Sequence, residues 1–189
     1  MDTKLIVQST PNPNALKFVL NIPVKSEGNT TYTSAAECTD NPLAKALFEL
    51  SASISEVYFF ENYITVTQNG SAGWNTLKEI LQSTILEKID THDPNFQTPE
   101  AQQSTPVTPQ SSPELDKINT ILNETIRPAL QMDGGDVQVI GYENKNLQIF
   151  YQGACGSCPS ATMGTLAAIQ RILQDQFDPE ITVSLADPF

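Results

Sequence analysis

Two cysteines, Cys155 and Cys158, stand in the stretch GACGSCPS and have the clearest chemistry of any residues in the sequence. Pro159 follows at once, and proline favours the first position of a helix. Cys158 is therefore expected at a helix N-terminus, where unpaired backbone N–H groups and the helix dipole stabilise a thiolate. Thiolates bind metals and attack disulfides. The pair predicts a metal or cluster site, a redox-active dithiol, or thiols with a structural role only.

The number of available ligands favours a site shared between two chains. A tetrahedral metal site or an iron–sulfur cluster takes about four protein ligands. The third cysteine is Cys38 and the single histidine is His92, both far from the pair in the sequence. One chain therefore cannot complete a Cys-rich site, whereas two copies of the loop in a twofold arrangement can. Such a site would be exposed and easily opened, which suits transfer better than storage.

A thioredoxin-type dithiol is the rival hypothesis, because a CxxC between a strand and a helix is also a redox signature. Here, however, the proline follows the second cysteine and does not lie between the two. The expected order of elements also lacks the alternation of strands and helices with parallel crossovers. A zinc-bridged interaction module is a third hypothesis.

The composition excludes several classes of partner. The chain has 22 acidic residues against 10 Lys and Arg, a formal charge of −12. Such a surface repels nucleic-acid phosphates and anionic membranes. No apolar run approaches the roughly 18 residues of a membrane span, and the start resembles neither a signal nor a transit peptide. Three cysteines fit a reducing compartment. We expect a soluble, cytoplasmic protein.

A segment rich in Pro, Ser, Thr and Gln divides the chain in two. It has too few large apolar residues to offset the entropy of ordering and is expected to be a flexible linker. The predicted organisation is two small α+β domains, residues 1–90 and 113–189, joined by a linker at residues 91–112.

Periodicity and turn residues give the expected elements of both halves. In the first half we expect strands at 4–9 and 15–20, a helix at 41–51, a hairpin at 54–68 and a helix at 73–89. In the second half we expect a helix at 112–130, a hairpin at 133–153, a helix at 159–177 and a strand at 181–185. The cysteine pair then lies between a strand and a helix.

Four stretches of the sequence resemble a known family. RPALQMDGGDVQV followed by GACGSCPSATMGTL closely resembles the C-terminal domain of NifU-like (Nfu) proteins. STPNPNALKFVL and NPLAKALFEL resemble the N-terminal domain found in many Nfu proteins. The resemblance covers nearly the whole chain except the linker.

The resemblance implies an iron–sulfur cluster scaffold or carrier. Family members hold a labile 4Fe–4S cluster between two subunits, and each subunit gives the two cysteines that match Cys155 and Cys158. The expected partners are upstream cluster donors, apo-proteins that receive the cluster, and a second copy of the chain. A 2Fe–2S cluster is the alternative cargo. The sequence has no Ser/His/Asp set and no phosphate-binding loop, so we do not expect an enzyme.

Other residues have plainer interpretations. DGGD at 133–136 is expected to be a helix-to-strand turn with positive φ at a glycine, and TPNPN at 10–14 an ordinary turn. Cys38 is interpreted as a partly buried thiol, His92 as a solvated linker residue, and Trp74 as an anchor of the N-terminal core.

Overall fold

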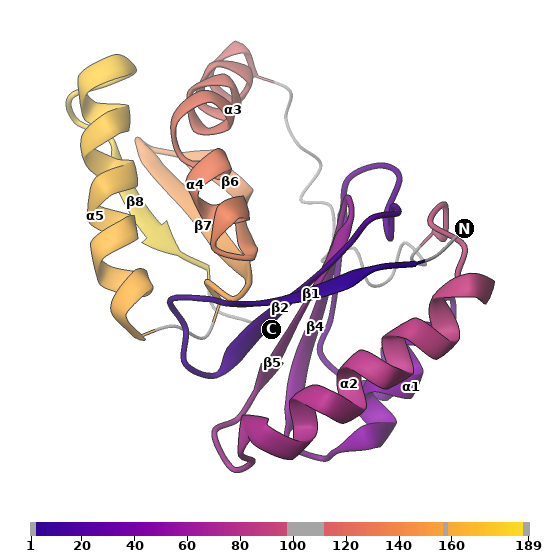
Figure 1. The fold of residues 1–189 in the computed structure, drawn as a ribbon. Helices are drawn as coiled ribbons and strands as arrows, with labels where there is room; N and C mark the ends of the chain where they lie inside the picture. The colour runs from indigo at the N-terminus through magenta and orange to yellow at the C-terminus, as the bar shows by residue number, and fades with distance from the viewer. Residues whose placement is uncertain (1–2, 98–111, 157–158, 187–189) are drawn as a thin grey trace.

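Both halves of the chain are α+β units, as the sequence predicts, in the computed structural model (Figure 1). The structure describes residues 3–97, 112–156 and 159–186, without the side chains of residues 159–163. We call the two units the N-terminal and the C-terminal unit. Among the described residues, no helix is long and apolar enough to cross a membrane.

The N-terminal unit is built on an antiparallel sheet with the strand order β1-β2-β5-β4-β3. The sequence predicts four of its strands and misses β3, whose residues NTTY carry no apolar alternation. The strands are β1 (Leu5–Ser9), β2 (Ala15–Leu20), β3 (Asn29–Tyr32), β4 (Ile54–Phe60) and β5 (Tyr63–Gln68). The helical elements are η1 (Ala35–Glu37), α1 (Pro42–Leu50), α2 (Trp74–Lys88) and η2 (Ile89–Thr91).

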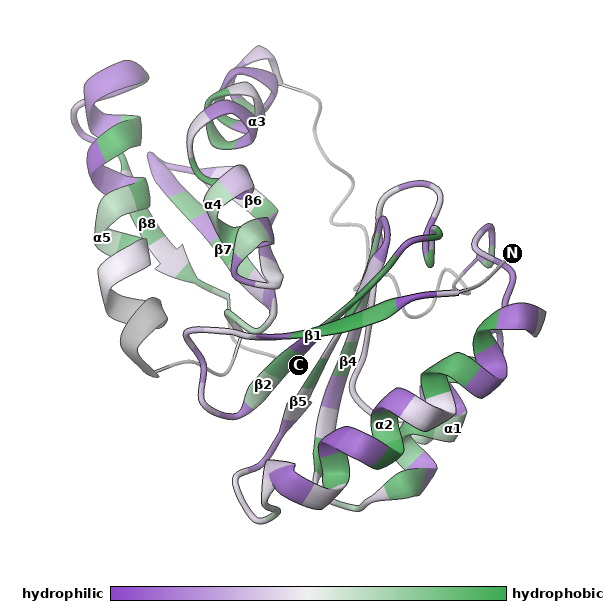
Figure 2. Ribbon diagram, viewed as in Figure 1, coloured by the Kyte–Doolittle hydropathy of each residue, from purple (hydrophilic) through white to green (hydrophobic). Residues whose placement is uncertain are grey.

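The helices α1 and α2 cover one face of this sheet (Figure 1). Helix α1 starts after Asn41, whose side chain accepts a hydrogen bond from the backbone N–H of Ala44. Hydrophobic and hydrophilic residues alternate along α2 in Figure 2, as an amphipathic helix requires. The buried side chains between the helices and the sheet include Phe18, Leu47, Val57, Phe59, Ile64, Val66, Leu77, Leu81 and Ile85.

The opposite face of the sheet carries polar side chains. Side chains alternate between the two faces of a strand, so the residues that stand between the buried ones lie on this second face. While alternate residues of β2, β4 and β5 enter the core, the intervening ones point away from α1 and α2. We call this second surface the polar face and define it by Lys17, Glu56, Tyr58, Tyr63 and Thr65. It is turned toward the C-terminal unit (Figure 1).

The packed N-terminal unit continues past the residue at which we expected the linker to begin. Phe96 is buried in the N-terminal core. The ring of His92 stacks on Phe59 at a centroid distance of 5.8 Å, and its Nε2 lies 2.7 Å from the Val24 carbonyl oxygen. Burial lowers the pKa of His92. The prediction of a solvated His92 is therefore wrong, because the rings of His92 and Phe96 pack against Phe59 of the sheet.

The C-terminal unit has a three-stranded sheet with the order β6-β7-β8. Strands β6 and β7 form the predicted antiparallel hairpin, and β8 pairs with β7 in parallel. The elements are α3 (Pro113–Thr125), α4 (Arg127–Met132), β6 (Gly135–Glu143), β7 (Asn146–Gly153), α5 (Pro159–Gln176) and β8 (Thr182–Leu185).

The first helix of this unit is interrupted, whereas the sequence pattern predicts one continuous helix over 112–130. Helix α3 ends at Thr125, and α4 starts at Arg127 with Pro128 in its first turn. Proline has no N–H to donate to the preceding turn, and its ring clashes with that turn, so the helix breaks. The break directs α4 toward the start of β6.

Candidate functional site

Cys155 lies between β7 and α5, in residues 153–156, which we call the cysteine loop. The residue is buried, with 4% of its surface exposed. The N–H of Gly156 donates to the Gly153 carbonyl oxygen at 3.1 Å and closes a turn around it. Helix α5 begins at Pro159, as predicted. Cys158 lies outside the described residues, so the structure places one thiol of the pair.

The DGGD stretch forms the glycine turn (residues 133–136), which packs directly against Cys155. Gly134 has a φ of +84°, so the predicted turn with positive φ is confirmed. A Cβ atom at Gly135 would lie 2.7 Å from the Cys155 Sγ atom and 2.5 Å from the Gln152 carbonyl oxygen. The turn therefore also supports the thiol, because only a residue without a side chain fits beneath Cys155.

Gly153 joins the cysteine loop to the glycine turn from the other side. Its φ is +65°, and a Cβ atom there would lie 2.5 Å from the Gly134 carbonyl oxygen. The N–H of Ala154 donates to that same oxygen at 3.1 Å. The two turns are thus fixed against each other by backbone contacts that exclude side chains.

The TPNPN turn of the N-terminal unit also reaches the cysteine loop. Asn12 is 1% exposed, and its Nδ2 donates to the Ala154 carbonyl oxygen at 3.0 Å. Its Oδ1 accepts from the N–H of Asn14 at 2.9 Å, which gives the local turn that the sequence predicts. The interpretation as an ordinary turn was incomplete, because a side chain that shapes the turn also contacts a loop 142 residues away.

Two residues of the polar face bind backbone atoms of these turns. The Glu56 Oε1 atom accepts a hydrogen bond from the N–H of Gly153 at 2.6 Å. The Thr65 hydroxyl donates to the Gly134 carbonyl oxygen at 2.7 Å. Burial raises the pKa of Glu56 to about 8, although the hydrogen bond from Gly153 opposes this shift. The residue as a whole is only partly buried, but its carboxyl group is enclosed by the contact.

Lys17 adds a third contact from the polar face. Its Nζ donates to the backbone carbonyls of Gln131 at 2.9 Å and Met132 at 3.3 Å, at the C-terminal end of α4. A cation suits this position because the last carbonyls of a helix have no partner within the helix. The same ammonium lies 4.0 Å from the centre of the Tyr63 ring. Burial lowers the pKa of Lys17.

Asp136 and three tyrosines complete the polar surroundings of the cysteine loop. Asp136 is buried, and its Oδ1 accepts from the N–H of Val137 at 2.7 Å, so it stabilises the start of β6. Burial raises the pKa of Tyr58 and Tyr63, and the nearby Asp136 adds to the effect. Burial and the neighbouring Cys155 raise the pKa of Tyr151. These phenols therefore stay neutral at physiological pH.

Cys38 takes no part in this site. Its side chain is in the N-terminal hydrophobic core, 2% exposed, and donates its S–H to the Ser34 carbonyl oxygen at 3.3 Å. Burial raises its pKa to about 12, so it is a neutral thiol and more deeply buried than the sequence suggests. Across the described residues, no group of three His, Cys, Asp or Glu side chains could hold a metal ion.

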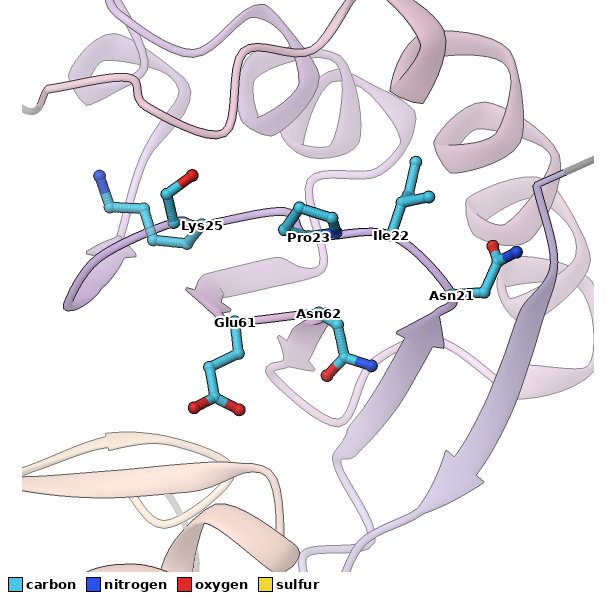
Figure 3. A pocket seen from close by; sticks show the side chains of 7 residues that line it. Asn21, Ile22, Pro23, Lys25, Glu61 and Asn62 are labelled. Atoms are coloured by element: carbon cyan, nitrogen blue, oxygen red, sulfur yellow. The ribbon is translucent and has the colours of Figure 1, made fainter. Parts of the chain in front are cut away.

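A surface hollow of about 380 Å³ lies elsewhere on the N-terminal unit (Figure 3). It is formed by the segment after β2 and by the turn between β4 and β5 (Figure 3). Neither described cysteine lines it, so it is distinct from the cysteine loop. Its lining residues are Asn21, Ile22, Pro23, Lys25, Ser26, Glu61 and Asn62.

Two family models match the chain and together cover both units. The model described as "Scaffold protein Nfu/NifU N terminal" matches residues 5–92, and the model described as "NifU-like domain" matches residues 118–184. The chain belongs to the NifU-like (Nfu) family. The second match includes both cysteines and the glycine turn, and the first includes the polar face. The resemblance seen in the sequence is thus confirmed for both halves.

Three relatives illustrate the family. The human protein named "NFU1 iron-sulfur cluster scaffold homolog, mitochondrial" is 36% identical over 172 residues, which is 88% of this chain and 65% of the human one. The protein of the same name from Drosophila persimilis is 32% identical over 88% of this chain and 59% of its own length. "NifU-like protein 4, mitochondrial" from Arabidopsis thaliana is 29% identical over 88% and 60%. This chain therefore spans about three fifths of the length of these relatives.

A solution structure of a NifU-like protein from Saccharomyces cerevisiae is 17% identical and covers 47% of this chain and 79% of its own. The TM-score between the two structures is 0.43.

The expected cytoplasmic location is contradicted by the relatives, which are named as mitochondrial proteins. A low cysteine count indicates a reducing compartment but does not distinguish one such compartment from another.

Sequence reasoning missed the residues by which the N-terminal unit contacts the C-terminal unit. Glu56 stands in the otherwise largely apolar strand ISEVYFF, and Lys17 stands in ALKFVL. A charged residue inside a strand with one buried face indicates that the other face is polar and meets either solvent or a polar partner. The sequence gives no indication of which partner that is.

Proposed function

We propose that this chain is an iron–sulfur cluster carrier that binds a 4Fe–4S cluster between two copies and delivers it to apo-proteins. Cys155 and Cys158 of each copy are the proposed ligands, and a 2Fe–2S cluster is the alternative cargo. The observation that carries the proposal is the position of Cys155 on a glycine-supported turn just before α5, within the stretch that matches the NifU-like domain.

The local structure suits thiolate ligands. Helix α5 starts directly after the cysteine pair, and the first N–H groups of a helix favour negative charge. The Gly156 N–H is used by the Gly153 carbonyl oxygen and holds the tight turn that carries Cys155. Backbone N–H groups near cluster sulfurs also tune the stability of a cluster.

The rest of the chain supports a site completed by a second copy. Cys38 and His92, the other residues with soft or imidazole ligands, are packed against the N-terminal core. Two thiolates per chain match half of the usual ligand set. In the proposed cycle the cluster is a cargo, accepted from an upstream donor and passed to a client apo-protein. The names of the relatives support a mitochondrial setting for this work.

Anaerobic reconstitution with iron and sulfide tests the proposal. We expect a coloured dimer with about four irons and four sulfides per two chains, and Cys155→Ser and Cys158→Ser should each abolish it. Cys38→Ser is the matched control and should keep the full iron content. Zinc bound without sulfide would support an interaction module. A colourless monomer that reduces disulfides catalytically would support an oxidoreductase.

A further inference from the structure

The polar face of the N-terminal sheet makes specific bonds to the backbone of the C-terminal unit. Glu56 binds the Gly153 N–H, and Thr65 binds the Gly134 carbonyl. Lys17 binds carbonyls at the end of α4. Buried polar side chains are costly without partners, and among the described residues these three form hydrogen bonds to backbone atoms of the other unit.

The contact also depends on shape. A Cβ atom at Gly153 would lie 3.1 Å from the Tyr58 ring, and one at Gly156 would lie 3.3 Å from the Glu56 Oε2 atom. At both positions the N-terminal sheet approaches the loop so closely that an added side chain would require Tyr58 or Glu56 to move. The polar face therefore fits a loop with glycine at these positions, and that loop contains Cys155.

This contact has the character of a reversible interface. The hydrophobic core of the N-terminal unit and that of the C-terminal unit are separate clusters of side chains. Hydrogen bonds from Asn12 and Glu56 join the units at the cysteine loop, and one from Thr65 joins them at the adjoining glycine turn. Interfaces between domains that are small and polar open readily, whereas a shared apolar core would not.

We propose that the polar face is a docking site for the cysteine loop of its own chain, and that the docked form is a closed state. It must open before Cys155 can bind a cluster shared with a second chain. The second half of this inference rests on the proposed function, whereas the docking itself does not.

The geometry of Cys155 makes the closed and cluster-bound states exclude each other. A cysteine ligand must bring its sulfur to within roughly 2.3 Å of the metal, and a shared cluster needs a second loop on the same side. In the docked form Cys155 is 4% exposed, and the neighbouring Ala154 and Gly156 lie against the N-terminal unit. Cys155 itself packs in the core of the C-terminal unit, and the docked sheet covers the loop around it on the side from which a second copy would approach.

Alkylation of Cys155 in the full-length apo-protein tests the docking without iron or sulfide. Iodoacetamide modification is followed for each cysteine by peptide mass spectrometry. We expect Cys155 to react roughly ten-fold faster in the double variant Glu56→Ala, Thr65→Val, which removes two buried hydrogen bonds. Cys38 serves as an internal control, because it should stay unreactive while the N-terminal core is folded.

Two control variants sharpen the experiment. Glu56→Gln keeps an oxygen that can accept from the Gly153 N–H, and Glu79→Ala removes an exposed carboxylate on α2, on the other side of the sheet. Both should keep the slow rate. Equal Cys155 rates in the wild type and the double variant would overturn the docking, as would an apo-protein that docks between chains and sediments as a dimer.

Hydrogen exchange gives a second readout if the double variant is poorly folded. The single variants Glu56→Ala and Thr65→Val should each raise exchange at the Gly153 and Ala154 amides and leave the β2–β5 amides protected. Unchanged exchange at these two amides would also overturn the docking.

Cluster loading then tests the closed state. In anaerobic reconstitution, the double variant should load faster than the wild type, with the same final iron content. Equal loading rates together with faster alkylation would show that docking is real but does not gate the site. Failure of both proteins to bind any cluster would instead refute the proposed function and leave the docking result standing.

Discussion

The Cys155 Sγ atom rests against the backbone of Gly135, so closely that a Cβ atom at position 135 would lie 2.7 Å from the sulfur. The same Cβ would lie 2.5 Å from the carbonyl oxygen of Gln152, which is backbone and cannot rotate away. The cysteine loop therefore packs directly on the backbone of the glycine turn, and its conformation depends on the absence of a side chain at position 135.

Gly135→Ala is expected to displace the cysteine loop and to abolish stable cluster binding. Overpacking of this kind costs about 1–3 kcal/mol, which lowers the melting temperature by several degrees. Iron content after reconstitution and thermal unfolding measure the two effects. Gly141→Ala is the matched control. Gly141 lies in the same strand as Gly135, and a Cβ atom there would have no other atom within 4 Å. A Gly135→Ala protein with full iron content would contradict the supporting role of the turn.

The docking of the cysteine loop on the polar face is expected to weaken as pH rises. Burial raises the pKa of Glu56 from its ordinary 4.5 to about 8 in the docked form. Between these values the docked form holds one proton more than the open form, so each rise in pH favours opening. The contribution of Glu56 to the docking free energy is present in full below about pH 4.5 and is progressively lost as the pH rises to about 8.

Small-angle scattering across this range should show a larger radius of gyration at the alkaline end. The neighbouring Tyr58 and Tyr63 stay neutral throughout, since burial raises the pKa of both. Glu56→Gln should remove most of the dependence, because its amide does not titrate. An unchanged pH dependence in Glu56→Gln would assign the effect to another group, such as Lys17, whose pKa is lowered by burial.

Cys38→Ala is expected to leave the cluster unchanged and to weaken the N-terminal unit. The thiol is buried in the core, and removing it leaves a small cavity that costs on the order of 1 kcal/mol. Chemical denaturation should show a lower midpoint, while iron and sulfide per chain stay at the wild-type value. A loss of iron would make Cys38 a ligand and would require a different arrangement of the two units.

Asn12→Ala is expected to loosen the cysteine loop from the TPNPN turn. The variant loses the bond to the Ala154 carbonyl and the bond from the Asn14 N–H that shapes the turn. Each buried hydrogen bond contributes about 1 kcal/mol. Faster hydrogen exchange in residues 153–156, with unchanged exchange in α2, is the expected result. Equal exchange in both proteins would show that Asn12 shapes only its own turn.

Local chemistry made much of this protein predictable. Periodicity and turn residues placed most helices and strands, and proline after Cys158 placed the start of α5. The helix break at Pro128 can also be predicted from the sequence, because the absence of a backbone N–H is a property of proline itself. Strand β3 could not be predicted from the sequence, because the residues NTTY become a strand only by pairing with β4.

The sequence by itself determined the α+β character of both halves, the cysteine spacing and the shortage of cysteine and histidine ligands within one chain. Tertiary structure alone decided what surrounds the cysteine loop. Glu56 meets Gly153 across 97 residues, and Thr65 meets Gly134 across 69. Contacts over such separations leave no periodicity in the sequence, because they arise only when two complete units fold and meet. The same holds for His92. Its neighbours in the sequence are polar, yet in the folded chain its ring packs on Phe59.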